Sequence, residues 1–430
     1  MWLVTEPSAT QPALQRRLGL GDAVTIGLGS MIGAGVFVVF APVAAAAAST
    51  AAVLLALAIA GFIAYCNATA SAQLAAQYPT SGGTYVFGRE RLGQWWGFVA
   101  GWSFVIGKTA SCAAMALTFA AYAAPAGWEK PVAIVAVVAL AAVNYRGITR
   151  TALATRIIVT IVLLVLAIVV AAAANSGVAE LAPAGLTLGE AGWYGILQAA
   201  GLMFFAFAGY ARIATLGEEV REPRRTIPRA VLVALALTMV VYGLIAVAVL
   251  SVLGIDALAL SSAPLADVVA AAGWGWAAPV VHVGAAAASL GALLALIAGV
   301  GRTSLAMARE GDLPQDLAAV HPRFAVPHRA EVALAIVVCA VILVADVRGA
   351  IGFSSFGVLL YYFVTNVAAI TQDRGNRLYP RALHVVGAAG CVTLVATLPV
   401  LSIAVGLGVV CVGVAVRLMS RFRNRNPIQW

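Results

Sequence analysis

A glycine-rich stretch near the start of the chain, Gly27 to Gly35, is the first feature whose residue types could support chemistry. It reads Gly-Leu-Gly-Ser-Met-Ile-Gly-Ala-Gly and lies inside a long apolar segment. Each glycine costs a helix about 1 kcal/mol relative to alanine, so four of them in nine residues predict an interruption. Inside a membrane, the N–H and C=O groups of an interrupted helix need polar partners. A bound ligand or ion would supply them; close approach of a neighbouring helix to the small residues is the alternative.

Lys108 is the second candidate, because it lies within the apolar segment 92–123. Placing an ionisable residue inside a membrane segment costs free energy, so such a residue is by default predicted to have a function. The chain has arginine at 24 of its 26 cationic positions and lysine only at Lys108 and Lys130. A buried lysine can release its proton, whereas arginine stays charged. We predict that Lys108 cycles a proton or that its charge replaces a bound sodium ion. The structural alternative is a lysine that snorkels to the surface or holds a helix carbonyl.

Three further polar residues lie in apolar segments. Arg212 follows a second glycine by three positions and could contact an anionic group or pair with Glu218 or Glu219. His282 could titrate near neutrality, or could simply be hydrogen-bonded. Ser289, deeper in the same segment, is placed to offer a hydroxyl to an ion.

Acidic residues are missing from the depth at which a proton relay would need them. None of the 17 Asp and Glu residues lies deep in an apolar segment, and Asp22, at the start of the first one, comes nearest. The sequence contains no cluster of His, Asp and Glu at one depth that would predict an enzyme. Gly107-Lys108-Thr109 lacks the upstream glycine of a nucleotide-binding loop. The sequence therefore predicts no catalysis, metal or cofactor. The five cysteines, which form no C-x-x-C pair, are interpreted as small buried residues: Cys66, Cys112, Cys339, Cys391 and Cys411.

The composition identifies the class of protein that must position these residues. The 430 residues are 63% hydrophobic and 10% charged, with a mean hydropathy of +0.99. Soluble domains carry about 25% charged residues, so the chain is predicted to be an integral membrane protein. About 20 helical residues cross the hydrocarbon layer. On this measure we predict an all-α protein with twelve transmembrane helices: 20–43, 49–76, 92–123, 130–146, 152–174, 192–214, 227–254, 275–305, 329–346, 349–370, 382–400 and 402–418.

The positive charges predict the orientation of these helices. If successive loops alternate between the two sides, one side receives 22 of the 26 Lys and Arg residues, and the other receives Lys130 and Arg348. Positive residues concentrate in cytoplasmic loops. We therefore expect a multi-pass protein of the plasma membrane with both termini in the cytoplasm. The net charge of +9 then reflects these loops rather than a nucleic-acid partner, and the basic stretch Arg417–Arg425 is expected to touch anionic lipid.

A second interruption is predicted in the sixth segment. Inverted-repeat transporters place their site where two corresponding helices are broken, and the sixth segment lies five after the first. It contains Phe204-Phe-Ala-Phe-Ala-Gly209-Tyr-Ala-Arg212. Gly209 follows the aromatic cluster near mid-membrane, so the two interruptions match. This match favours a transport site over simple helix packing.

The motifs resemble those of amino acid–polyamine–organocation (APC) superfamily permeases. Gly29-Ser-Met-Ile-Gly33-Ala-Gly35-Val-Phe37 is similar to the first-helix signature of that superfamily. Phe204–Tyr210 and the run Glu218-Glu219 to Pro228 resemble its sixth helix and following loop. Ser81-Gly82-Gly83-Thr-Tyr85, Ala308-Arg309-Glu-Gly311-Asp-Leu313-Pro314 and His321-Pro322-Arg323 are supporting matches.

The resemblance implies a five-plus-five inverted repeat with interrupted helices 1 and 6. Residues 20–174 would form the first repeat, 192–370 the second and 382–418 helices 11 and 12, with tails at 1–19 and 419–430. Amide N–H groups of the first interruption would bind a substrate carboxylate, carbonyl groups would bind its ammonium, and a phenylalanine would close over it. Mapped by position, the donors are Gly33, Ala34 and Gly35, the carbonyls are those of Met31, Phe205 and Ala208, the gate is Phe205 or Phe207, and Ile32 and Gly209 complete the site.

The chain also departs from the family pattern. Tyr65-Cys-Asn67 stands where relatives often have Tyr-x-Glu, and Ala211-Arg212 stands where many have an acidic residue. The helix-5 lysine of some proton-coupled relatives would fall near Val162 and is missing. Lys108, Arg212, His282 and Ser289 therefore remain as the coupling candidates.

These features together predict a secondary active transporter of amino acids or related amines that works by alternating access. Proton coupling is the first expectation and exchange the alternative. A non-transport polytopic protein or a channel is disfavoured, because neither a polar constellation nor a filter-like repeat is present.

Overall fold

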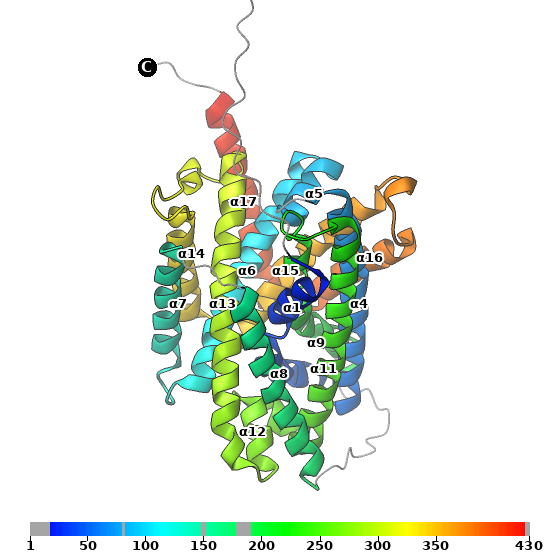
Figure 1. Ribbon diagram of the computed structural model, residues 1–430, viewed down its shortest axis with the longest axis vertical. Helices are drawn as coiled ribbons and strands as arrows, with labels where there is room; N and C mark the ends of the chain where they lie inside the picture. The colour runs from blue at the N-terminus through cyan, green and yellow to red at the C-terminus, as the bar shows by residue number, and fades with distance from the viewer. Residues whose placement is uncertain (1–17, 80–81, 148–151, 178–190, 426–430) are drawn as a thin grey trace, which may run out of the picture.

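The computed structural model describes residues 18–79, 82–147, 152–177 and 191–425. These residues form an elongated bundle of helices (Figure 1). Within the described ranges no β-strand occurs, and an isolated bridge joins Leu18 to Val220.

The first half of the chain contains α1 to α8. Their bounds are α1 Leu20–Met31, α2 Ala34–Val38, α3 Phe40–Ala47, α4 Thr50–Gln77, α5 Gly83–Leu92, α6 Gln94–Ala123, α7 Glu129–Tyr145 and α8 Ala152–Asn175. The second half contains α9 to α17. Their bounds are α9 Gly192–Phe207, α10 Ala211–Ala214, α11 Pro223–Leu260, α12 Pro264–Ala271, α13 Ala278–Arg309, α14 His328–Val344, α15 Val347–Ile370, α16 Arg381–Thr397 and α17 Val400–Arg425.

Each predicted apolar segment contains helix, and the ends agree within a few residues for most segments. Eight stretches of the described chain are long and apolar enough to cross a membrane. The apolar helices α9 and α16 are shorter, at 16 and 17 residues, and α7 and α14 have 17 residues each. The all-helical, polytopic membrane class is therefore confirmed. The last helix also continues beyond the predicted end at 418, to Arg425.

Two short helices were not predicted from the sequence. α5 lies at the upper end of the bundle in Figure 1, near the end of α17, whereas α12 lies at the lower end. Both are too short to cross a membrane, which needs about 20 residues. They instead cover the two ends of the bundle.

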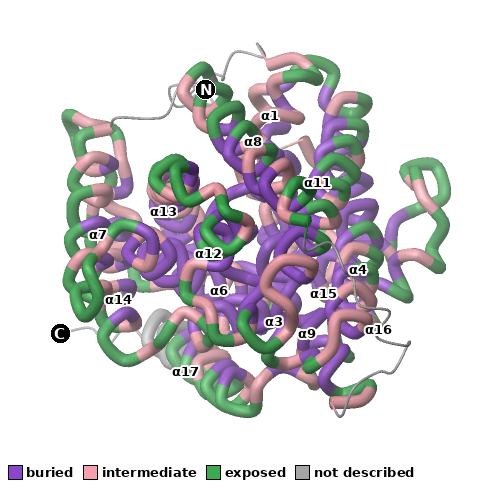
Figure 2. The backbone as a smooth tube through the Cα atoms, turned by 90° about the horizontal axis from the view of Figure 1, so that it is seen from below, coloured by how far each residue is buried: buried purple, intermediate pink, exposed green. Residues whose placement is uncertain are grey.

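The core is formed by α6, α15 and the interrupted segments α1–α3 and α9. Seen along the bundle in Figure 2, the buried backbone is concentrated around α6, α9 and α15, and α7, α14, α16 and α17 lie at the periphery. α6 packs against α13 and α15, and α4 packs against α9 and α11. Outer helices expose large apolar side chains such as Val400 and Leu401, which are 74% and 75% exposed. Such a surface suits contact with lipid rather than water.

Candidate functional site

The first apolar segment is interrupted within the predicted glycine stretch. α1 ends at Met31, and Ile32 follows with φ −83° and ψ 56°, outside the helical range. Gly33 has φ −102° and ψ −144°, and α2 begins at Ala34. The N–H groups of a first helical turn have no acceptor within their own helix. Ala34 and Gly35 therefore open α2 at the position predicted to meet a carboxylate.

The sixth apolar segment is interrupted around Gly209. α9 ends at Phe207 and α10 begins at Ala211. Between them the N–H of Gly209 donates to the Phe207 carbonyl at 2.8 Å, which closes a tight turn.

The two interruptions contact each other through their backbones. A Cβ atom added to Gly209 would lie 2.2 Å from the Ser30 oxygen and 2.6 Å from the Met31 nitrogen. A Cβ atom added to Gly35 would lie 3.0 Å from the Cα of Ala206. Residues far apart in sequence thus meet at one point in the core, and two glycines permit this approach.

Tyr242 of α11 joins the two interruptions by hydrogen bonds. Its fully buried hydroxyl lies 2.6 Å from the Met31 oxygen and 3.0 Å from the Ala206 oxygen. The sequence analysis missed this residue. The available signal was a tyrosine in an apolar segment, since a buried phenol usually has a hydrogen-bond partner.

Lys108 reaches the second interruption. Its side chain is 8% exposed, and its ammonium donates to the Ala208 carbonyl at 3.2 Å. The Tyr362 hydroxyl lies 3.5 Å from the same oxygen. One turn of α6 is fixed here by close backbone contact, because a Cβ on Gly107 would lie 3.1 Å from the Gly357 Cα of α15.

The carbonyl groups expected to bind a substrate ammonium therefore already have donors within the protein. Met31 accepts from Tyr242, Ala208 accepts from Lys108 and Phe205 accepts from the N–H of Ala208 at 3.4 Å. In this conformation these oxygens are satisfied, which the sequence analysis did not predict.

The two candidate gate residues are packed in the core. Phe207 is fully buried, and its ring meets the Tyr242 ring edge-on with centroids 5.1 Å apart. Phe205 is 6% exposed, and its ring lies 3.7 Å from a Cβ placed on Gly35. Both rings adjoin the interruptions, and their role as gates stays a prediction.

Ser289 lies on α13, which also packs against α2. Its hydroxyl is fully buried, and no hydrogen-bond partner is found for it among the described residues. Ala292, three residues further along α13, lies 3.2 Å from a Cβ placed on Gly33. Ser289 is therefore near the first interruption with an unused hydroxyl.

Arg212 lies just past the second interruption, where its backbone N–H donates to the Gly209 carbonyl at 3.0 Å, whereas His282 lies on a different helix, α13. Arg212 donates to the Thr215 hydroxyl at 3.3 Å, at the end of its own short helix. His282 hydrogen-bonds through Nδ1 to the Tyr122 carbonyl, and its ring packs edge-on against Tyr122. The Tyr122 hydroxyl in turn donates to the Phe37 carbonyl at 2.8 Å and accepts from the N–H of Leu265 in α12 at 3.4 Å. His282 thus belongs to a cluster on the α12 side of the site.

A buried charge cluster joins α5, α17 and the loop after α13. Asp312 is 2% exposed and lies 2.7 Å from Arg417 and 3.5 Å from Arg89. The Tyr85 hydroxyl donates to Asp312 at 2.9 Å. Burial and the nearby Asp312 carboxylate raise the pKa of Tyr85, so the phenol stays a donor.

Arg417 corrects one prediction. We expected it to touch lipid with the rest of the basic C-terminal stretch, but its side chain is fully buried. Its guanidinium lies over the rings of Trp95 and Phe98, 4.4 and 4.5 Å from their centroids. Arginine binds carboxylates and stacks on aromatic faces at once, and local sequence does not show that both partners are present.

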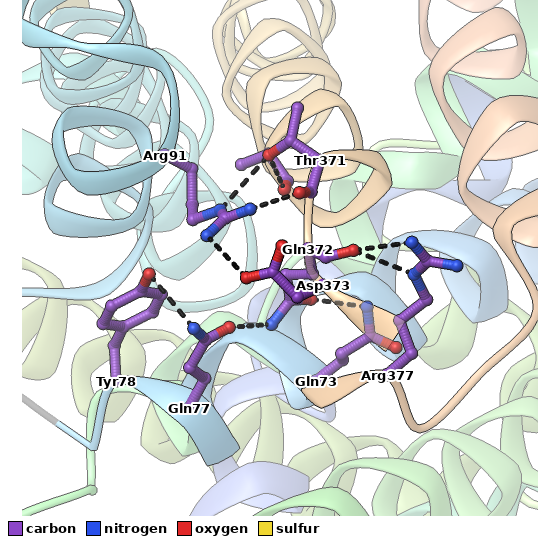
Figure 3. Close-up of polar contacts among 9 residues, drawn as sticks. Gln73, Gln77, Tyr78, Arg91, Thr371, Gln372, Asp373 and Arg377 are labelled. Carbon is purple, nitrogen blue, oxygen red and sulfur yellow. Dashed lines mark hydrogen bonds and ion pairs between the residues drawn. The ribbon is translucent and has the colours of Figure 1, made fainter. Parts of the chain in front are cut away.

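A second polar network connects the ends of α4, α5 and α15 (Figure 3). Gln73 donates to Gln372 at 2.5 Å, and Gln372 donates to Gln77 at 2.5 Å. Arg91 hydrogen-bonds to Thr371 and lies 3.8 Å from Asp373. These contacts fix the end of α15 beside the end of α4.

Comparison with known proteins gives matches along almost the whole chain. A family model described as amino acid permease matches residues 18–421. A Mycobacterium tuberculosis protein named "Uncharacterized transporter" is 57% identical over 425 residues, covering 99% of this chain and 96% of the relative.

Two more distant relatives have names that state a class of substrate. The branched-chain amino acid permease BcaP of Bacillus subtilis is 25% identical over 341 residues, covering 74% of this chain and 72% of the relative. Human cationic amino acid transporter 4 is 28% identical over 387 residues, covering 83% of this chain and 60% of the relative.

Proposed function

Because the chain belongs to the amino acid permease family, we propose that it is a secondary active transporter that moves amino acids or related amines by alternating access. The family makes it a membrane transporter and not an enzyme, and the resemblance to APC superfamily permeases is confirmed.

The observation that carries the proposal is the contact between the two interruptions. Met31 and Gly209 come from helices interrupted near the middle of the core, and their backbones touch. Interrupted helices at the interface of two repeats are the usual transport site of such carriers. In our proposal a substrate carboxylate binds the N–H groups of Gly33, Ala34 and Gly35, because helix N-termini attract anions.

The packing of the helices supports a five-plus-five inverted repeat. If α4, α6, α7 and α8 correspond to α11, α13, α14 and α15, then α1 corresponds to α9. The contact of α1 with α11 has its counterpart in that of α9 with α4, and the contact of α1 with α8 has its counterpart in that of α9 with α15. The contact of α8 with α13 likewise corresponds to that of α15 with α6. We therefore retain twelve crossings, with α16 and α17 outside the repeat.

The charge distribution supports cytoplasmic termini. α5, which carries Arg89 and Arg91, lies at the same end of the bundle as the end of α17. The connection from Gly254 to Ala277, at the α12 end, contains no Lys or Arg. By the positive-inside rule the α5 end faces the cytoplasm and the α12 end faces outward.

Lys108 is our candidate for coupling. It is buried at the second interruption and, among the ion pairs of the described residues, none includes it. A lysine without a carboxylate partner in a dry site can change its protonation state with modest structural change. Lys108→Gln should therefore alter the pH dependence of uptake. An unchanged rate and pH profile would remove Lys108 from the coupling step.

The experiment that tests the function is uptake into proteoliposomes of radiolabelled amino acids and polyamines, with and without an inward proton gradient. The panel should include leucine and arginine, because the relatives carry branched-chain and cationic names. Gradient-stimulated, saturable uptake is the expected result. Uptake that requires preloaded substrate would indicate an exchanger, and no saturable uptake of any amine would contradict the proposal.

A further inference from the structure

Four carbonyl oxygens at the two interruptions have donors of unequal kind. Those of Met31 and Ala206 share the single proton of the Tyr242 hydroxyl, and that of Phe205 accepts from a backbone N–H. The Ala208 oxygen is held by an ammonium group, that of Lys108. This is the same chemical group that an amino acid would present there. We propose that the Lys108 ammonium is a resident occupant of the amine position, so that a substrate ammonium binds by displacing it from Ala208. This inference rests on the proposed function.

The geometry permits Lys108 to leave while its backbone stays in place. The close contact between Gly107 and Gly357 fixes this turn of α6. The lysine side chain, however, has a flexible four-carbon stem with three rotatable donors. Tyr242, by contrast, holds its two carbonyls with a rigid ring that is packed against Phe207. Of these donors, Lys108 is therefore the one that can be exchanged for a ligand without unpacking the core.

A small cavity offers the displaced ammonium a destination. It has a volume of about 30 Å³ and is lined by Phe104, Thr215, Thr303 and Tyr361, among others. Phe104 lies one turn before Lys108 on the same face of α6, and helix side chains lean toward the preceding turn. The Thr303 hydroxyl donates to a backbone carbonyl, which leaves its oxygen as an acceptor, whereas the Thr215 oxygen already accepts from Arg212. Gly82, Gly83 and Tyr85, at the start of α5, also line the cavity.

The proposal has a consequence for ligand selectivity. When a ligand lacks an ammonium, Lys108 can return to the Ala208 oxygen, and no buried acceptor stays unpaired. Removing the ammonium from a substrate should therefore weaken binding only slightly. Without Lys108, the same removal leaves the Ala208 carbonyl with Tyr362 at 3.5 Å as its remaining side-chain neighbour. An unpaired buried acceptor is strongly unfavourable.

The test compares amino acids with their desamino analogues in proteoliposomes. The probe pairs are L-leucine with 4-methylpentanoate and L-arginine with 5-guanidinopentanoate. For each transported amino acid, the measured quantity is a selectivity ratio, the inhibition constant of the analogue divided by the KM of the amino acid. We expect this ratio to be below about ten in the wild type. In Lys108→Met it should be higher than the wild-type value by about tenfold or more.

Lys130→Met is the matched control, because Lys130 is the other lysine of the chain and is exposed, with its ammonium donating to the Leu343 carbonyl. It should leave the ratio unchanged. If Lys108→Met does not fold, Lys108→Gln takes its place in the same comparison. The wild-type ratio is a test by itself, since a value above about one hundred contradicts the proposal.

Three further results would overturn the inference. A parallel loss of affinity for both members of a pair in Lys108→Met would mean that Lys108 holds the carboxylate. An unchanged ratio in Lys108→Met, while the wild type transports amino acids, would reject the inference alone. No uptake of any amino acid by the wild type would reject the proposed function and, with it, this inference.

Discussion

The Cα atom of Gly209 lies directly against the peptide group that joins Ser30 to Met31. No side chain fits between them, because a Cβ at position 209 would lie 2.2 Å from the Ser30 oxygen. The contact joins the two apolar segments close to the places where their helices are interrupted.

Gly209→Ala should therefore separate the two interruptions and abolish transport. Overpacking costs about 1–3 kcal/mol where side chains can adjust, and here the obstacle is backbone. We expect a lower melting temperature in detergent and loss of uptake at equal expression. Gly243→Ala in α11 is the control, since its added Cβ meets nothing within 4 Å; it should keep full uptake. Normal uptake by Gly209→Ala would refute the backbone contact.

Tyr242→Phe should destabilise the site without changing its shape. The substitution removes the hydroxyl shared by Met31 and Ala206 and leaves the ring. A buried acceptor without a donor costs about 1–3 kcal/mol. Thermal unfolding and the rate of uptake should both report the loss. Tyr194→Phe, at a position that is 53% exposed, should have no effect, and equal behaviour of the two variants would contradict the assignment.

Arg417→Met should destabilise the end of the bundle near α5. It leaves Asp312 buried with Arg89, 3.5 Å away, as its remaining ion-pair partner. Removing one member of a buried pair costs about 3–5 kcal/mol. Adding Asp312→Asn should recover part of this loss, which thermal unfolding of the single and double variants will measure. Arg348→Met, at an exposed position, is the control. A double variant no more stable than Arg417→Met would argue against the pair.

The orientation of the protein can be tested by cysteine labelling. Glu90, within α5, and Ser262, next to α12, are exposed and lie toward opposite ends of the bundle. In a background with Cys339→Ala and Cys411→Ala, a membrane-impermeant maleimide added to intact cells should label Ser262→Cys and not Glu90→Cys. Lysed cells, in which both should react, provide the control. The reverse pattern would invert the predicted topology.

Local patterns were sufficient for the long apolar helices and for the places of the two interruptions, but not for the short helices α5 and α12. Apolar length and clustered glycines act within one segment, so Gly33 and Gly209 could be identified from sequence alone. The burial of Lys108 was predictable for the same reason, because it lies in an apolar segment.

The partners of these residues were not predictable. Lys108 meets Ala208, and Tyr242 meets Met31, through contacts between segments far apart in the chain. One sequence does not state which face of each helix points inward. The same limit explains Arg417, whose basic neighbours indicated a lipid-facing tail although its partners Asp312 and Trp95 lie elsewhere in the chain.

The contact between Gly107 and Gly357 restricts how such a carrier can move. The two backbones touch without intervening side chains, so a shift of α6 relative to α15 would break this close packing. α6 and α15 should therefore travel as one rigid frame through the transport cycle. The hinges must then lie in the interrupted segments, where Ile32 and Gly209 already depart from helical geometry. Lys108 lies on α6 and donates a hydrogen bond to the second interruption, so it would link the rigid pair of helices to the segment that moves.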